Sequence, residues 1–270
     1  MSSLSKTLGV LDLFGPQQLQ IDPDTIAARM GLSRATVYRY VKDLCEAGLL
    51  TRAGVGSYAL GPRIIELDWM MRQYDPILTA GRELMHTLSD ETGLAVFASV
   101  FYDGRIINTF ITKPNDSYHF AFGRGQPLPL FRGAQSKVLV AHQKGRHLQK
   151  LFEERISKDP VNPCAAYSWS EFARVAKKIR KDGYCITHDE LNLGLTGIAA
   201  PIIDLEDKAV VASLSAVGTT DSFKLLRQET VIDMVIATTR RIAANMQVQR
   251  TAILPEHSAE TRRPATQQKP

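Results

Sequence analysis

GLSRATVYRYVKDLCEAG, residues 31–48, is the stretch that decides the fold of the N-terminal part of this 270-residue chain. Ser33 is a good N-cap, and apolar side chains then recur every three or four residues up to Gly48. That spacing predicts an amphipathic helix from Arg34 to about Ala47, with one face turned to a core. The predicted core face consists of Val37, Tyr40, Val41, Leu44 and Cys45.

The residues on both sides of this stretch complete a winged helix-turn-helix. Asp22 and Pro23 open a short helix that ends before Gly31, and a further helix is predicted over residues 3–14. Downstream, residues 49–52 and 57–60 have the pattern of two short strands around a glycine-containing turn. Helix, tight turn, helix and hairpin within 61 residues predict a module whose second helix enters the major groove of DNA.

Candidate DNA-binding residues lie on the predicted outer face of the second helix, at its N-terminal turn and in the wing. Arginine can bond guanine or phosphate, hydroxyl groups can bond phosphate, and a helix N-terminus attracts anions. The candidates are Ser33, Arg34, Ala35, Thr36, Tyr38, Arg39, Lys42 and Arg52.

Charge placement supports a DNA partner only in part. Residues 29–63 hold six Lys or Arg against two acidic residues, whereas residues 1–28 hold three Asp and a single Lys. This weak net charge predicts moderate affinity for each module and reliance on dimerisation. The alternative is a sensory or docking module that keeps the winged helix without using it on DNA.

The second half has the pattern of a mixed α/β domain. Residues 94–103 and 105–113 predict a hairpin, residues 136–143 and 168–181 predict helices, and two β-branched runs surround a polar turn at 205–208. A long helix is expected from Phe223 to Met246. We therefore expect a DNA-binding domain at 1–61, linker helices at 62–82, an effector-binding domain at 83–250 and a disordered tail at 251–270.

A candidate ligand site precedes the helix predicted around residues 136–143. Backbone amides at a helix start can hold an anion, and an arginine can grip a carboxylate with two parallel bonds. We expect a small carboxylate here, held by these amides and Arg132, with Phe131 covering its apolar part. The candidate residues are Phe131, Arg132, Gly133, Ala134, Gln135 and Ser136.

Other classes of function find little support in the residues. The segment from Cys185 to Glu190 joins a thiol, an imidazole and carboxylates, but adjacency in sequence does not provide catalytic geometry. The six histidines and three cysteines show no metal-binding or disulfide spacing. The sequence predicts no enzyme, no cofactor, no metal, no export signal and no membrane span, and a cytoplasmic location.

Motifs in both halves resemble the IclR family of transcriptional regulators. Residues 31–39, 48–50 and 57–61 are similar to its N-terminal domain, and residues 125–130, 183–184, 194–201 and 212–215 to its effector domain. The resemblance implies a GAF-like sensory domain, a homodimer or dimer of dimers, and control of a catabolic operon by a small organic acid, aromatic acids included. By the same resemblance, the opposite wall of the effector site comes from Asp189, Glu190, Gly197, Ser213 and Ser215.

The chain departs from the family pattern at one turn. Arg132 and Gln135 are large and polar where the family has small residues. Together, the two halves predict a ligand-responsive regulator that binds a double-stranded operator as a dimer.

Overall fold

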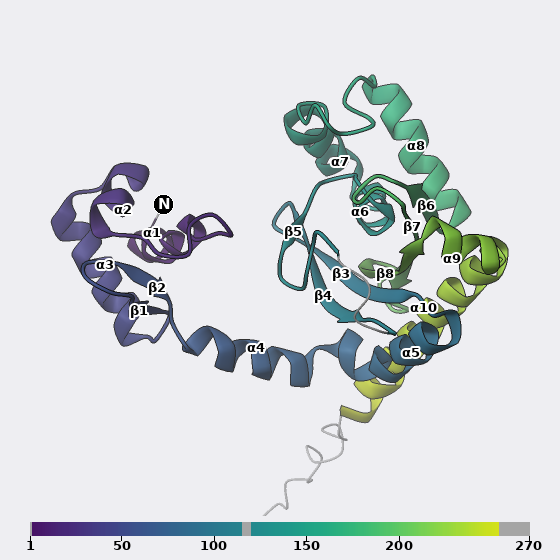
Figure 1. The fold of residues 1–270 in the computed structure, drawn as a ribbon, viewed down its shortest axis with the longest axis horizontal. Helices are drawn as coiled ribbons and strands as arrows, with labels where there is room; N and C mark the ends of the chain where they lie inside the picture. Colours follow the sequence, from purple (N-terminus) through teal and green to yellow (C-terminus); the bar gives the residue numbers. More distant parts are fainter. Residues whose placement is uncertain (1, 115–119, 254–270) are drawn as a thin grey trace, which may run out of the picture. The chain divides into compact units, whose positions relative to one another are not determined.

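A computed structural model describes residues 2–114 and 120–253, and the chain forms two compact units that meet between Asp75 and Pro76 (Figure 1). The first unit contains helices α1 (Ser3–Gly9), α2 (Pro23–Met30), α3 (Arg34–Glu46) and α4 (Arg63–Tyr74), with a 3-10 turn at Leu11–Leu13. Strands β1 (Leu50–Arg52) and β2 (Tyr58–Leu60) pair antiparallel as the predicted wing.

Capping explains where the helices of the first unit begin and end. The Asp22 carboxylate accepts from the Thr25 backbone N–H at the start of α2, and Gly31 closes that helix with φ +63°. Ser33 then caps α3 by accepting from the Thr36 backbone N–H. The core behind α3 contains Val37, Tyr40, Val41 and Leu44, as expected, together with Val10, Ile21, Ile26 and Leu50.

The second unit is built on a six-stranded antiparallel sheet with the strand order β5-β4-β3-β8-β7-β6. Its strands are β3 (Ala95–Tyr102), β4 (Arg105–Thr112), β5 (Pro127–Leu128), β6 (Cys185–His188), β7 (Leu195–Ile203) and β8 (Val210–Thr219). Because strand side chains alternate, Ala212, Leu214 and Ala216 point to one core while Ser213 and Ser215 point to the opposite face.

Helices cover both faces of this sheet (Figure 1). Helices α5 (Pro76–Thr92) and α10 (Gln228–Ile253) pack together on one face. Helix α6 (Ala134–Ala141) lies on the other face and carries α8 (Trp169–Asp182) behind it. The remaining elements are α7 (Gly145–Leu151), a π-helical turn (Phe152–Ile156) and α9 (Thr220–Leu225). The expected combination of a winged helix and a mixed α/β domain is confirmed.

Several details differ from the sequence-based expectations. The helix expected at 223–246 is two helices, α9 and α10, and the second continues to Ile253. Residues 76–82, expected in a linker, belong to the second unit as the start of α5. The tail expected at 251–270 lies outside the described residues from position 254 onward. No helix in the described part of the chain is long and apolar enough to cross a membrane.

Candidate functional site

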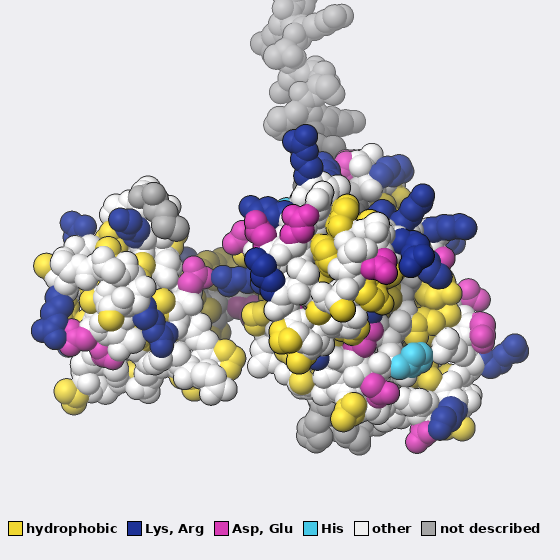
Figure 2. Space-filling view, turned by 90° about the horizontal axis from the view of Figure 1, so that it is seen from above, with side chains coloured by type: hydrophobic (Ala, Val, Ile, Leu, Met, Phe, Trp, Pro, Cys, Tyr) yellow, Lys and Arg dark blue, Asp and Glu magenta, His cyan; other side chains and the backbone are white. Residues whose placement is uncertain are grey.

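The exposed face of α3 presents most of the side chains predicted to contact DNA. Ser33, Arg34, Ala35, Tyr38, Arg39 and Lys42 are exposed, Thr36 is half-buried, and Arg52 is exposed on β1. The same helix buries its opposite face in the core, so these residues share one outer surface. In Figure 2 the Lys and Arg side chains of this unit are distributed over the visible face and do not form one patch.

Most of the cationic side chains on this surface already have contacts within the unit. Arg34 forms a two-pronged ion pair with Asp24 of α2, with both N–O distances at 2.5 Å. The Arg39 guanidinium lies 5.5 Å from the centroid of the Tyr40 ring, and Lys42 lies 3.6 Å from Glu46. The role of Asp24 in placing Arg34 was not foreseen, because the two residues are ten positions apart and belong to different helices.

A cavity opens in the second unit between the first turn of α6 and the loop 189–194. Its empty space is about 440 Å³, a volume that includes the open mouth. Aromatic and aliphatic side chains form most of its wall, and Glu190 is the one charged residue among the described lining residues. The apolar wall contains Phe97, Phe120, Phe122, Leu128, Leu191, Leu195 and Val217.

Left-handed backbone positions shape both loops that border this cavity. Phe131 and Asp189 both have φ +58°, which is uncommon for residues other than glycine. Gly133 has φ +78°, and a Cβ at this position would lie 2.5 Å from Cδ1 of Leu191. Glycine therefore allows the loop 189–194 to approach the start of α6 closely.

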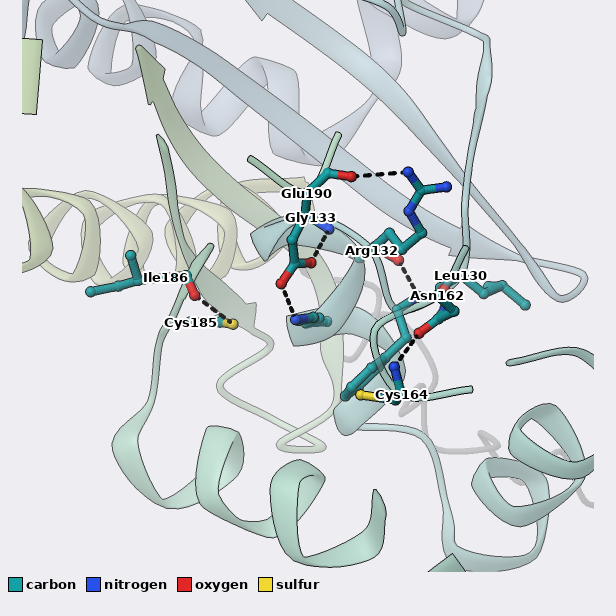
Figure 3. A network of polar contacts seen from close by, with 11 residues as sticks. Leu130, Arg132, Gly133, Asn162, Cys164, Cys185, Ile186 and Glu190 are labelled. Atoms are coloured by element: carbon teal, nitrogen blue, oxygen red, sulfur yellow. Dashed lines mark hydrogen bonds and ion pairs between the residues drawn. The ribbon is translucent and has the colours of Figure 1, made fainter. Parts of the chain in front are cut away.

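The anion-binding groups at the start of α6 are bound by the chain's own carboxylate, Glu190 (Figure 3). The Gly133 backbone N–H donates to Oε2 of Glu190 at 3.0 Å, and the Lys137 ammonium forms an ion pair with Oε1. Arg132 donates to the Glu190 backbone carbonyl at 3.0 Å. The side chains of Lys137 and Glu190 are only 12% and 16% exposed, so the pair is mostly shielded from water.

The structure brings together some of the predicted effector residues and separates others. Gly133, Gln135, Glu190 and Gly197 line the cavity. The other predicted residues are absent from its lining: Phe131, Arg132, Ala134, Ser136, Asp189, Ser213 and Ser215.

Phe131 and Arg132 do not line the cavity, contrary to expectation. Phe131 is fully buried, because the left-handed backbone turns its side chain into the core. Its ring centroid lies 4.5 Å from the ring centroid of Phe172. The aromatic cover of the cavity comes instead from Phe97, Phe120 and Phe122. Phe97 lies on β3, whereas Phe120 and Phe122 lie in the segment between β4 and β5, and the sequence gives no sign that the two segments share a wall.

Of the other candidates, Ser136 and Asp189 stabilise the loops beside the cavity, whereas the Ser213 and Ser215 side chains have no hydrogen bonds within the described residues. Ser136 accepts from the Phe131 backbone N–H and donates to the Pro129 carbonyl, which stabilises the turn before α6. Asp189 accepts from the Gly194 backbone N–H and closes the loop 189–194. The hydroxyls of Ser213 and Ser215 are fully buried and have no hydrogen-bond partner within the described residues.

The cluster at residues 185–190 does not have catalytic geometry. Burial raises the pKa of the Cys185 thiol to about 11, so it stays protonated and is a poor nucleophile near neutral pH. His188 is exposed, and its Nδ1 lies 2.8 Å from the Thr196 hydroxyl. Among the described residues, no three His, Cys, Asp or Glu side chains gather as a metal site, and His119 and His257 lie outside them.

Comparison with known proteins agrees with both units. Residues 3–54 match the IclR helix-turn-helix domain, and residues 72–244 match the C-terminal domain of bacterial IclR transcriptional regulators. The chain is 25% identical over 249 residues to the transcriptional regulator KdgR of Escherichia coli, covering 91% of this chain and 93% of that protein. It is 24% identical over 228 residues to the Pca operon regulatory protein of Acinetobacter baylyi, covering 82% and 80%.

Solved structures share the fold. An IclR transcriptional regulator from Alicyclobacillus acidocaldarius has a TM-score of 0.72 at 21% identity, covering 91% of this chain and 97% of that one. An IclR homolog from Microbacterium hydrocarbonoxydans, complexed with 4-hydroxybenzoate, has a TM-score of 0.71 at 20% identity, covering 92% and 100%.

A winged helix joined to a separate cavity-bearing α/β unit defines the class of DNA-binding transcriptional regulators. Within that class, the chain belongs to the IclR family. The relatives named above are regulatory proteins.

Proposed function

We propose that this chain regulates a catabolic operon, binding its operator through α3 and the wing and responding to a small organic acid held in the second unit. The observation that carries the proposal is the outer face of α3, where exposed Arg34, Arg39 and Lys42 stand on a helix whose other face is fixed in a core. A rigid helix with cationic groups on its free side fits the major groove.

An aromatic acid is the effector class that we favour. Three aromatic side chains, Phe97, Phe120 and Phe122, line the cavity. One relative, 21% identical over 248 residues, is the p-hydroxybenzoate hydroxylase transcriptional activator of Acinetobacter baylyi, and one structural neighbour is complexed with 4-hydroxybenzoate.

The proposed division of labour follows the order of the chain. Residues 1–61 bind DNA, residues 62–82 transmit the signal, residues 83–250 bind the effector, and two or four copies assemble. Effector binding shifts the equilibrium only if it favours one arrangement of the DNA-binding modules. Helix α4 is suited to pairing copies, because it buries none of its own residues.

Operator selection from a random pool of DNA duplexes tests the proposal. Wild-type protein is expected to enrich a roughly palindromic motif, and Arg39→Ala with Lys42→Ala should weaken binding about tenfold or more and flatten its salt dependence. Lys177→Ala with Lys181→Ala, which removes two exposed charges from α8, is the matched control and should bind like wild type.

A docking module is the competing function. It would enrich no motif, and loss of Arg39 and Lys42 would leave its weak DNA binding unchanged. Either result would contradict the proposal.

A further inference from the structure

The cavity has almost no free charge to offer a ligand. Glu190 is its one charged lining residue within the described chain, and that carboxylate is bound by Lys137 and the Gly133 backbone N–H. Both side chains are mostly buried, so pulling the pair apart would expose one charge to a poorly solvated site. A carboxylate ligand therefore gains little from Lys137 while Glu190 stays in place.

Two further polar side chains in the lining, Asn108 and Thr196, are also occupied. Asn108 accepts from the Ser99 hydroxyl at 2.7 Å and donates to the Phe122 carbonyl at 3.2 Å. The Thr196 hydroxyl lies 2.8 Å from Nδ1 of His188 and 3.4 Å from the Thr220 hydroxyl. These hydrogen bonds hold the walls of the cavity together, and a ligand could bind the Asn108 or Thr196 side chain only by breaking one of them.

Gln135, Thr187 and the half-buried Asn192 are the exceptions, and of these Gln135 and Thr187 are the buried ones. Gln135 is 4% exposed and Thr187 is 6% exposed, both line the cavity, and neither has a hydrogen-bond partner in the described part of the chain. Their polar atoms are not among the fully enclosed atoms without a partner, which in the described chain are the Ser213 and Ser215 hydroxyls, so both groups remain accessible from the cavity. A few polar groups that converge on an otherwise apolar cavity are what a ligand site offers for hydrogen bonding.

Resting on the proposed function, we infer that Gln135 and Thr187 recognise an uncharged group of the ligand, such as a phenolic hydroxyl, by hydrogen bonds. This group is carried by an aromatic ring that packs against Phe97, Phe120 and Phe122. The carboxamide can both donate and accept, which matches a hydroxyl. Any carboxylate on the same ligand lies outside the Lys137–Glu190 pair. Gln135 is thus a specificity-determining residue of this chain.

Titration calorimetry with 4-hydroxybenzoate and benzoate isolates the hydroxyl, because both probes carry the same carboxylate. Wild-type protein should prefer 4-hydroxybenzoate by about tenfold, since a site built for a hydroxyl rejects the analogue without it. Gln135→Leu should bring the preference close to one while benzoate binding changes little. Gln135→Met serves as a second apolar variant, and Thr187→Val should reduce the preference in part.

The stability of the ligand-free protein gives a second readout. If Gln135 is reserved for a ligand, Gln135→Leu or Gln135→Met should raise the thermal midpoint or leave it unchanged. A clear loss of stability in both variants would overturn the inference, because the carboxamide would then have a structural role.

Two binding results would also overturn it. One is a preference for 4-hydroxybenzoate that survives both apolar substitutions, and the other is no binding of either probe to wild-type protein. Neither result bears on operator selection, so failure of this inference is distinguishable from failure of the proposed function.

Discussion

Glu190 shows how one residue can change the chemistry of a whole site. Without it, the Gly133 amide and the Lys137 ammonium would form a strong anion site; with it, both are already bound. The same carboxylate joins the loop 189–194 to the start of α6, two segments that lie more than fifty residues apart in the sequence. We therefore expect Glu190 to contribute to the stability of the second unit as well as to the selectivity of its cavity for ligands.

Glu190→Gln should lower the free energy of unfolding by about 2 kcal/mol, somewhat less than the ~3–5 kcal/mol typical of a fully buried pair. The amide can still accept from Gly133, but the Lys137 ammonium loses its counter-charge. Urea unfolding measures the difference. Glu154→Gln is the control, since its pair with Lys150 is exposed and 4.0 Å long and should matter little. Equal losses in the free energy of unfolding for Glu190→Gln and Glu154→Gln would contradict a stabilising role of the Glu190–Lys137 pair.

His142 predicts a pH dependence on the acid side. Burial lowers the pKa of its imidazole below the ordinary value of 6.5, and Nδ1 lies 2.8 Å from the Val138 carbonyl. The unfolded chain therefore binds the proton more readily. The contribution of this residue to stability is complete above pH 6.5 and is lost as the pH falls below it.

His142→Gln should therefore flatten the fall in the free energy of unfolding between about pH 7.5 and about pH 5.5. Denaturant titrations across that range measure it, with exposed His147→Gln as the comparison. An unchanged slope in the His142 variant would show that the imidazole does not titrate differently in the folded protein.

At the scale of elements, α5 and α10 depend on a residue without a side chain. A Cβ on Gly81 would lie 2.8 Å from Cγ1 and 2.9 Å from Cδ1 of Ile242. Glycine is a poor helix former, so its presence inside α5 is explained by the close approach of the two helices.

Gly81→Ala should lower the free energy of unfolding by about 1 kcal/mol or more, because overpacking against Ile242 outweighs the ~1 kcal/mol gain in helix propensity. Thermal or urea unfolding shows whether the substitution lowers or raises the free energy of unfolding. Gly145→Ala is the matched control at the start of α7, where an added Cβ meets nothing within 4 Å. A more stable Gly81 variant would mean that α10 can shift to make room.

At the scale of the whole molecule, α4 leaves apolar surface uncovered. Ile65 is 73% exposed, Trp69 is 61% exposed and Met71 is 53% exposed, and the helix has no buried residue. A helix with apolar side chains around most of its circumference is stable when another element covers it. In the proposed dimer on a palindromic operator, a second copy of α4 would cover this surface.

Leu67→Glu with Met71→Lys should convert the assembly to monomers in sedimentation experiments at micromolar concentration. The pair has favourable spacing for a helical ion pair, so α4 itself should remain folded. Gln73→Lys, at an exposed polar position, should leave the assembly intact. A monomeric wild type, or an unaffected double variant, would remove α4 from the interface.

The sequence by itself determined the winged helix and most of the α/β unit. Capping residues, glycine stops and apolar periodicity act within a few residues, so Ser33, Gly31 and the core face of α3 could be placed correctly. The family followed from motifs in both halves.

Only the tertiary structure decided which groups meet at the cavity of the second unit. The pairing of Glu190 with Lys137, the turn of Phe131 into the core and the unpartnered Gln135 all arise from contacts between segments distant in the chain. Local pattern carries no record of such contacts, because the free energy of a buried charge or amide depends on which partners folding brings within hydrogen-bond distance.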